Sequence, residues 1–170
     1  MRRIAVLACL AMLSAGAFSR DANSDFRMFL MKLLPKVRRA FETKDVGFFD
    51  KMSTADFSET MGGKTTTKAQ SMAEMKRWTS MSSNIKCSFK LLSAKADGSM
   101  GTATFADHMT FNMKPQKKGD KMHKMAMDMW EKQTWARSGK GWKIKMIEEM
   151  KPTKMWMDGK PMDPSKMGGG

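Results

Sequence analysis

Two glutamates at strand positions could do acid–base chemistry if they face each other. Glu131 and Glu148 stand on either side of the turn Ser138–Gly141, in two segments of alternating apolar residues. Counting back from that turn in an antiparallel hairpin places Trp135 opposite Ile144 and Glu131 opposite Glu148. Two buried carboxyl groups in this position repel, which raises the pKa of at least one and leaves a proton to share. The alternative is that both lie near solvent and pair with Lys or Arg.

Asp107 is a third acid–base candidate. It is the polar exception in the alternating segment 103–113, so it is predicted to share the apolar face of that strand, near Met127. Its neighbour His108 must point to the opposite face, and the two cannot form a catalytic dyad. Asp107, Glu131 and Glu148 would serve a lyase or an isomerase. The sequence contains no HExxH motif, no nucleophile elbow and no CxxC motif.

Thioether and imidazole groups that could bind a soft metal ion gather at residues 122–129. An exported Cu(I)-binding protein would use Met122, His123, Met125, Met127 and Met129, because soft sulfur selects Cu(I). The chain has 22 methionines, however, and many stand at predicted core positions of helices and strands. Methionine replacing other core residues is the simpler interpretation, so we expect no metal ion and no other cofactor.

Three helices and then a set of strands must position these side chains. Helical spacing and capping residues predict helices that begin at Asn23 or Ser24, after Asp45, and after Thr67, where Gln70 completes a capping box. Pro35 is expected to kink or restart the first helix. The stretch 55–66 is expected to be irregular, and from residue 84 the period changes to two, which predicts four strands with a common apolar face.

The turn at residues 96–98 sets the register of the first two predicted strands. A three-residue loop with Gly98 in the left-handed conformation places Phe105 opposite Phe89. A two-residue Asp-Gly turn would place Phe105 opposite Lys90 and divide the apolar face, so we expect the longer loop. The fourth strand is expected to end near Met150, with a short edge strand at residues 156–157.

Two segments resemble motifs of the NTF2-like, or SnoaL-like, superfamily. Residues 44–57 look like its "gDv-aflaly-dDf" turn, and residues 134–144 are similar to its closing hairpin, "v-W-r-dGkW+I". The resemblance implies an α+β fold, a cone in which three N-terminal helices pack on a curved, mostly antiparallel sheet, with a pocket at the open end and frequent dimers. Ketosteroid-isomerase-like members stabilise an enolate with a tyrosine, and this chain has no tyrosine.

The chain divides into a predicted signal peptide at residues 1–19, an NTF2-like domain at residues 24–157 and a flexible tail at residues 158–170. The leader has a basic start, a short apolar run and a small-residue cleavage site, which predicts a secreted or periplasmic protein with no membrane span. Cys87 would then be the single remaining cysteine and is predicted to be a core residue. The net charge of +14 is dispersed, so we expect a basic surface and no specific nucleic-acid site.

These observations favour a binding protein over an enzyme. We expect an exported cone that binds a small apolar or amphipathic molecule or forms a homodimer, without evident catalysis. The predicted pocket residues are aromatic and thioether side chains with a few carboxyl groups to orient the ligand: Trp78, Phe89, Phe105, Asp107, Met127, Met129, Glu131, Trp135, Trp142 and Glu148.

Overall fold

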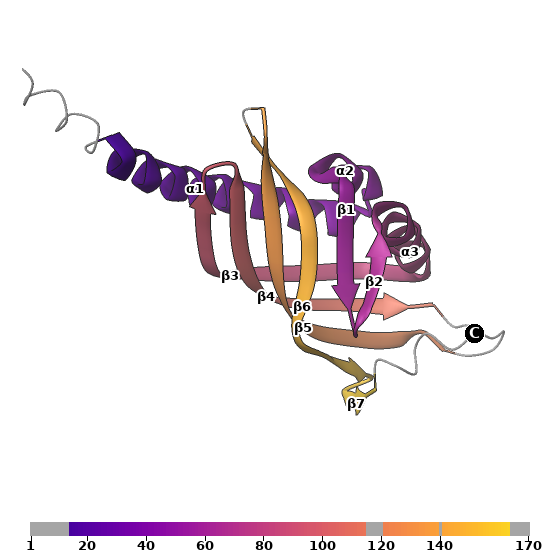
Figure 1. Cartoon of the computed structure of the whole chain (residues 1–170). Helices are drawn as coiled ribbons and strands as arrows, with labels where there is room; N and C mark the ends of the chain where they lie inside the picture. Colours follow the sequence, from indigo (N-terminus) through magenta and orange to yellow (C-terminus); the bar gives the residue numbers. More distant parts are fainter. Residues whose placement is uncertain (1–13, 115–120, 140, 164–170) are drawn as a thin grey trace, which may run out of the picture.

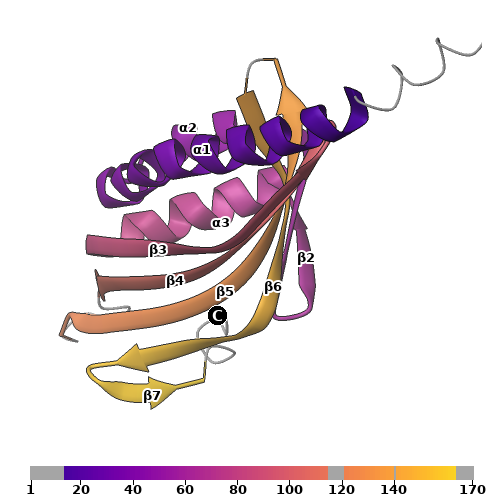
Figure 2. The ribbon, with the colours of Figure 1, turned by 90° about the vertical axis from the view of Figure 1, so that its left-hand side faces the viewer.

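In the part of the chain that the structure describes, three helices pack on one face of a curved sheet (Figures 1 and 2). The computed structural model describes residues 14–114, 121–139 and 141–163. No helix in these ranges is long and apolar enough to cross a membrane. In chain order the elements are α1 (Ser14–Thr43), α2 (Val46–Met52), β1 (Ser53–Met61), β2 (Lys64–Thr67), α3 (Lys68–Met81), β3 (Ser82–Asp97), β4 (Met100–Met113), β5 (His123–Ser138), β6 (Gly141–Met157) and β7 (Lys160–Met162).

The strands form one mixed sheet in the order β2-β1-β6-β5-β4-β3, and β7 pairs with β6. The pair β1–β6 is parallel and the other pairs are antiparallel. Figure 2 shows α1 and α3 lying over the concave side of the sheet, where β5 and β6 curve upward beside them. The predicted α+β cone, with three helices on a curved and mostly antiparallel sheet, is therefore confirmed.

Helix α1 differs from the prediction at its start, and it continues through Pro35. It begins at Ser14 and not at a cap on Asn23 or Ser24. The Asn23 side chain has another role, because its Oδ1 accepts a hydrogen bond of 2.6 Å from the Ala96 N–H at the end of β3. Pro35 lies inside the helix without ending it. Pro35 has no N–H to donate to the carbonyl of Met31, one turn before it. Both residues are exposed, so water can reach that carbonyl.

The other two helices begin where the sequence predicts. Asp45 caps α2, with its Oδ1 accepting from the Phe48 N–H at 3.0 Å. Thr67 and Gln70 form the capping box of α3. The irregular stretch expected before α3 is wrong, because β1 and β2 form a hairpin there. Gly62 and Gly63 close it, both with positive φ, a conformation that glycine adopts without strain.

The register of β3 and β4 also differs from the prediction. The turn is the two-residue Gly98-Ser99, and Phe105 lies opposite Leu91 and not opposite Phe89. A register shift between Leu91 and Ser93 leaves Leu92 as an extra residue on β3. This bulge returns the apolar residues of both strands to one face, which a two-residue turn alone would have divided.

A second bulge separates the two glutamates that were predicted to face each other. Trp135 does lie opposite Ile144, but the register shifts at the next pair, where Lys145 is the extra residue of β6. Glu131 therefore lies opposite Glu149, and Glu148 lies opposite Lys132. The Lys132 Nζ is 3.3 Å from Glu148 Oε2, and both side chains are substantially exposed. The predicted Glu131/Glu148 carboxyl pair is wrong, and the ion-pair alternative describes Glu148.

The sheet extends further toward the C-terminus than the alternation predicts. Strand β6 continues past Met150 to Met157. Strand β7 then folds back on it within the segment that was predicted to be a flexible tail. Glu149 stabilises the irregular passage at Pro152, because its Oε1 accepts from the Thr153 N–H at 2.8 Å and its Oε2 accepts from the Gly62 N–H at 2.8 Å. Residues 1–13, which hold most of the predicted signal peptide, and residues 164–170 lie outside the described residues.

The core consists of two apolar clusters between the helices and the sheet. The first joins α1 to the sheet and contains Phe26, Leu30, Trp135 and Trp142. The second contains Ile85, Cys87, Met109, Phe111, Met113, Met125 and Met155. Four of these seven residues are methionines, so in this protein methionine does fill core positions.

Candidate functional site

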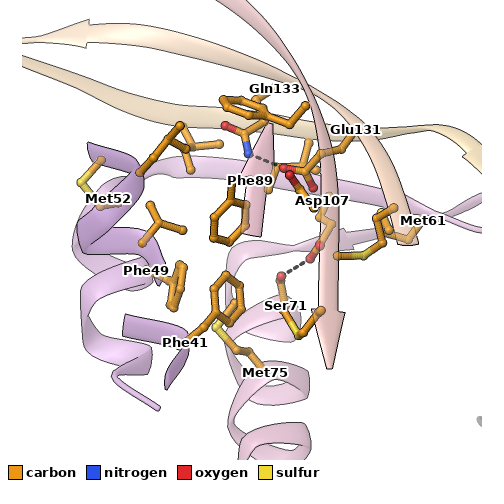
Figure 3. Close-up of a pocket in the computed structure, with 18 of the residues that line it drawn as sticks. Phe41, Phe49, Met52, Met61, Ser71, Met75, Phe89, Asp107, Glu131 and Gln133 are labelled. Atoms are coloured by element: carbon orange, nitrogen blue, oxygen red, sulfur yellow. Dashed lines mark hydrogen bonds between the residues drawn. The ribbon is translucent and has the colours of Figure 1, made fainter. Parts of the chain in front are cut away.

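A cavity of about 460 Å³ opens between the three helices and the concave face of the sheet (Figure 3). Its size is typical of sites for small organic ligands. The residues that line it come from α1, α2, α3, β1, β3, β4, β5 and β6: Leu30, Leu33, Leu34, Val37, Phe41, Phe48, Phe49, Met52, Glu59, Met61, Ser71, Glu74, Met75, Trp78, Phe89, Phe105, Asp107, Met109, Phe111, Met127, Met129, Glu131, Gln133, Trp135, Ile144, Ile147 and Met155.

Most of the residues predicted for a pocket do line this cavity. They are Trp78, Phe89, Phe105, Asp107, Met127, Met129, Glu131 and Trp135. Trp142 does not line it, because its ring packs in the core against Phe26 with a centroid distance of 4.6 Å. Glu148 does not line it either, because the bulge at Lys145 turns its side chain to the other face of the sheet.

Asp107 and Glu131 are diagonal neighbours on the inner face of β4 and β5. Asp107 pairs with Met129 and Glu131 pairs with Phe105, and Met127 is the other diagonal neighbour of Asp107 on β5, near it as predicted. Figure 3 shows the two carboxyl groups close together at the wall of the cavity. Gln133 lies on the same face of β5, and its Nε2 donates a hydrogen bond to Glu131 Oε1.

Asp107 has an unsatisfied polar atom at the cavity. Its exposed fraction is 6%, and its Oδ1 has no hydrogen-bond partner among the described residues. Burial raises the pKa of Asp107 to about 8, and the Glu131 carboxyl adds to the shift. Burial also raises the pKa of Glu131 to about 7, where the Gln133 hydrogen bond opposes the shift and the charge of Glu59 adds to it. Each carboxyl is therefore easier to keep protonated than a carboxyl in water.

Glu59 is a third carboxyl group of the cavity, and the sequence analysis did not identify it. It lies on β1, and its Oε2 accepts a hydrogen bond from the Ser71 hydroxyl of α3. Burial raises the pKa of Glu59, the Ser71 hydrogen bond opposes the shift, and the charge of Glu74 adds to it. The alternation of Phe57, Glu59 and Met61 is a strand signal that could have placed Glu59 on an inner face.

An aromatic cluster lies next to these carboxyl groups in the wall of the cavity. Phe41 is at its centre, with ring centroids 4.5 Å from Phe49, 6.0 Å from Phe89 and 6.4 Å from Trp78. Phe89 lies directly opposite Asp107 on the neighbouring strand. The cluster is therefore an apolar surface that presents ring faces and edges close to a carboxyl group.

The indole of Trp135, which also lines the cavity, contains a second unpaired polar group. Its Nε1 is buried and has no hydrogen-bond partner in the part of the chain that the structure describes. The rings of Phe26 and Phe29 surround it, with centroid distances of 6.2 Å and 5.8 Å. Trp135 thus supplies a hydrogen-bond donor among otherwise apolar groups.

The five side chains of the copper hypothesis do not meet at one exposed site. Met125 is 2% exposed and belongs to the second core cluster, whereas Met122 is 50% exposed. His123 Nδ1 lies 2.8 Å from Asp158 Oδ2. Among residues 14–114, 121–139 and 141–163, no group of three or more His, Cys, Asp or Glu side chains is placed to hold a metal ion. Because Met125 is buried in the core, the five side chains do not form the single exposed site that the copper hypothesis requires.

His108 and Cys87 are both where the alternation predicts. His108 is exposed on the outer face, and its Nδ1 lies 2.7 Å from Asp128 Oδ1. Cys87 is buried in the second core cluster. Burial raises the pKa of the Cys87 thiol to about 11, and the charge of Glu42 adds to the shift. Neither residue lines the cavity, and the thiol is protonated near neutral pH.

Comparisons of this chain with known proteins identify its fold. No protein-family model matches the sequence, and no curated protein matches it. Solved structures do match. A conserved protein from Planctomyces limnophilus DSM 3776 is 13% identical, with 80% of this chain and 97% of that chain covered and a TM-score of 0.62. An NTF2-like superfamily protein from Salmonella enterica serovar Typhimurium LT2 is 16% identical, with coverage of 77% and 94% and a TM-score of 0.60.

A third similar structure is a type 2 hexachlorocyclohexane dehydrochlorinase, 12% identical, with 81% of this chain and 89% of that chain covered and a TM-score of 0.57. At these identities the similarity concerns the fold. The chain has the NTF2-like fold, as the resemblance of residues 44–57 and 134–144 implied. Proteins with this fold differ in function, so the fold alone does not decide what the cavity does.

Proposed function

We propose that this protein binds a small amphipathic molecule in the cavity between its helices and its sheet. The observation that carries the proposal is an apolar cavity of about 460 Å³ that Asp107 lines, with its Oδ1 buried and without a hydrogen-bond partner among the described residues. A buried polar atom without a hydrogen bond costs about 1–3 kcal/mol, which a ligand with a matching polar group would recover. The apolar walls would hold the rest of the ligand.

The proposal is tested with N-phenyl-1-naphthylamine, an uncharged fluorescent probe whose emission rises in apolar surroundings. We expect saturable binding at one site per chain. The matched pair of variants is Met75→Trp, which adds volume inside the cavity, and Met31→Trp, which makes the same change at an exposed position of α1. Met75→Trp should weaken binding about tenfold or more, which corresponds to about 1.4 kcal/mol, and Met31→Trp should leave it unchanged.

Two results would reject ligand binding in this cavity. One is the absence of saturable probe binding by the folded parent protein. The other is equal binding by Met75→Trp and the parent, which would mean that the probe occupies another site. Thermal unfolding of both variants establishes that each is folded at the temperature of the titration.

Acid–base catalysis by a lyase or an isomerase is a second candidate, and the neighbouring Asp107 and Glu131 carboxyl groups favour it. Both have a raised pKa, and one can hold a proton while the other accepts one. If they catalyse proton transfer, the protein should speed the exchange of the α-protons of 2-decanone for deuterium in D₂O, as followed by NMR. Glu131→Gln should abolish this acceleration. An exchange rate equal to that in buffer would count against the enzyme.

Export and self-association belong to the same proposal. Secretion rests on the predicted signal peptide of residues 1–19, and the appearance of a shortened chain outside the cytoplasm would support it. A homodimer rests on the resemblance of residues 44–57 and 134–144, and sedimentation velocity would distinguish a dimer from a monomer of 19.2 kDa.

A further inference from the structure

The charge of the cavity is opposite to that of the whole chain. The formal net charge is +14, with 31 Lys and Arg against 17 Asp and Glu. Yet every ionisable side chain that lines the cavity is acidic: Glu59, Glu74, Asp107 and Glu131. Among the described residues no Lys, Arg or His lines it. In a protein with this excess of basic residues, an exclusively acidic cavity lining suggests that the acidic groups serve the ligand.

The elements around Asp107 and Glu131 present no cationic partner to them. The cavity residues of α1, α2, β3 and β6 are all uncharged, those of α3 include Glu74, and β1 contributes Glu59. Cys87, on β3, is the other titratable group near Asp107, and burial raises its pKa to about 11. Gln133 satisfies one oxygen of Glu131, and the Ser71 hydroxyl satisfies one oxygen of Glu59. Asp107 lines the cavity, and its Oδ1 stays unpaired among the described residues.

The aromatic side chains of the cavity suit an organic cation as well. Phe89 is the cross-strand neighbour of Asp107, Phe41 packs against Phe89 and Trp78, and the faces of such rings attract cations, most strongly where water is excluded. The other walls are apolar, so the bound cation must carry apolar groups of its own. A hydrated metal ion does not have this character, and a protonated amine on an apolar chain does.

We propose that the cavity selects amphiphiles with a cationic head, such as a protonated amine on an apolar chain, and that Asp107 and Glu131 receive that head. This inference rests on the proposed ligand-binding function and adds the charge of the ligand to it. When the ammonium group arrives, a carboxyl group gives up its proton to solvent and the carboxylate pairs with the ammonium. Binding of one amine is therefore accompanied by the release of one proton from each carboxyl group that was protonated before binding and is ionised after it.

Three ligands that differ only in the head group test the proposal: decylamine, decanol and decanoate, each below its micelle-forming concentration. Each competes with N-phenyl-1-naphthylamine at pH 8, where the three heads are cationic, neutral and anionic. We expect decylamine to bind at least about tenfold more tightly than decanol, and decanoate to bind most weakly. Attraction by the basic surface alone would favour decanoate, so it predicts the opposite order.

Isosteric variants assign the preference to the two carboxyl groups. Asp107→Asn and Glu131→Gln should each remove most of the preference for decylamine over decanol while decanol still binds, which also shows that the variants are folded. The matched control is Glu148→Gln, which removes a carboxylate from the outer face of the neighbouring strand, where it pairs with Lys132. It should behave as the parent does.

The pH dependence has a defined sign. The cation binds the ionised carboxyl groups, so the affinity for decylamine should rise from pH 6 to pH 9 while the affinity for decanol does not. Calorimetry in two buffers with different ionisation enthalpies should detect the released protons. If decanol displaces the probe as well as decylamine does, the cationic head is rejected and the ligand-binding function stands. If neither the probe nor any competitor binds, both are rejected.

Discussion

Asp107 and Glu131 lie diagonally opposite each other on β4 and β5, one inward-facing position apart, with Met129 and Phe105 completing the two pairs. Neither position belongs to a recognisable catalytic motif. What makes the two residues chemically unusual is their common burial at the wall of one cavity, with the carboxyl of Glu131 adding to the raised pKa of Asp107. Two neighbouring acids that resist ionisation have consequences for stability as well as for binding.

The free energy of unfolding should fall as the pH rises from about 5 to about 8. The pKa of Asp107 is raised from 3.8 to about 8 and that of Glu131 from 4.5 to about 7, so the folded protein holds protons that the unfolded chain has lost. The slope is about 1.4 kcal/mol per pH unit for each such proton. Urea denaturation at several pH values measures it. Asp107→Asn should flatten the slope, and Asp25→Asn, at an exposed position of α1, should not.

Cys87 should react slowly with thiol reagents in the folded protein. Burial raises the pKa of its thiol from 9.0 to about 11, which leaves about 100-fold less thiolate at pH 8 than an ordinary thiol has, and its exposed fraction is 7%. Labelling with Ellman's reagent in a Cys9→Ser background measures the rate. Reaction at the rate of the urea-unfolded chain would show that Cys87 is accessible and would contradict the buried position.

Gly101→Ala should destabilise the protein by about 1–3 kcal/mol, because the new methyl group would overpack the core. A Cβ atom at Gly101 would lie 2.8 Å from Cζ of Phe26, a ring that packs against Trp135 and Trp142. Gly47→Ala in α2 is the matched control, with a nearest contact of 3.4 Å, and should have little effect. Denaturant unfolding gives both values. Equal effects of the two substitutions would mean that the Phe26 contact does not restrict Gly101.

Thr67→Ala should cost about 1 kcal/mol of stability, because it removes half of the capping box of α3. The Thr67 hydroxyl accepts from the Gln70 N–H at 3.4 Å, and Gln70 Oε1 accepts from the Thr67 N–H at 2.9 Å. Thr67→Ser keeps the hydroxyl and should retain most of the stability. A loss as large for Thr67→Ser as for Thr67→Ala would place the effect in the methyl group and not in the cap.

Local sequence signals correctly predicted the features that depend on residues close together in the chain, namely two helix caps and the inward or outward direction of strand side chains. The caps at Asp45 and Thr67 form between residues three positions apart, so a short stretch of sequence contains the whole interaction. The alternation around Asp107 likewise predicts that this residue faces the core and His108 does not. The same local reasoning missed β1, because its alternation is short, from Phe57 to Met61, and the strand is stabilised by pairing with β6.

The sequence by itself determined the types of most elements, the inner and outer faces of the central strands and the acidic residues available to a site. The tertiary structure decided which of those acids meet. The extra residue Lys145 turned Glu148 out to Lys132, while the parallel pairing of β1 with β6 brought Glu59 to the same cavity as Glu131. The physical reason is that periodicity sets the direction of each side chain along one strand, whereas bulges and strand order depend on contacts between residues far apart in the chain.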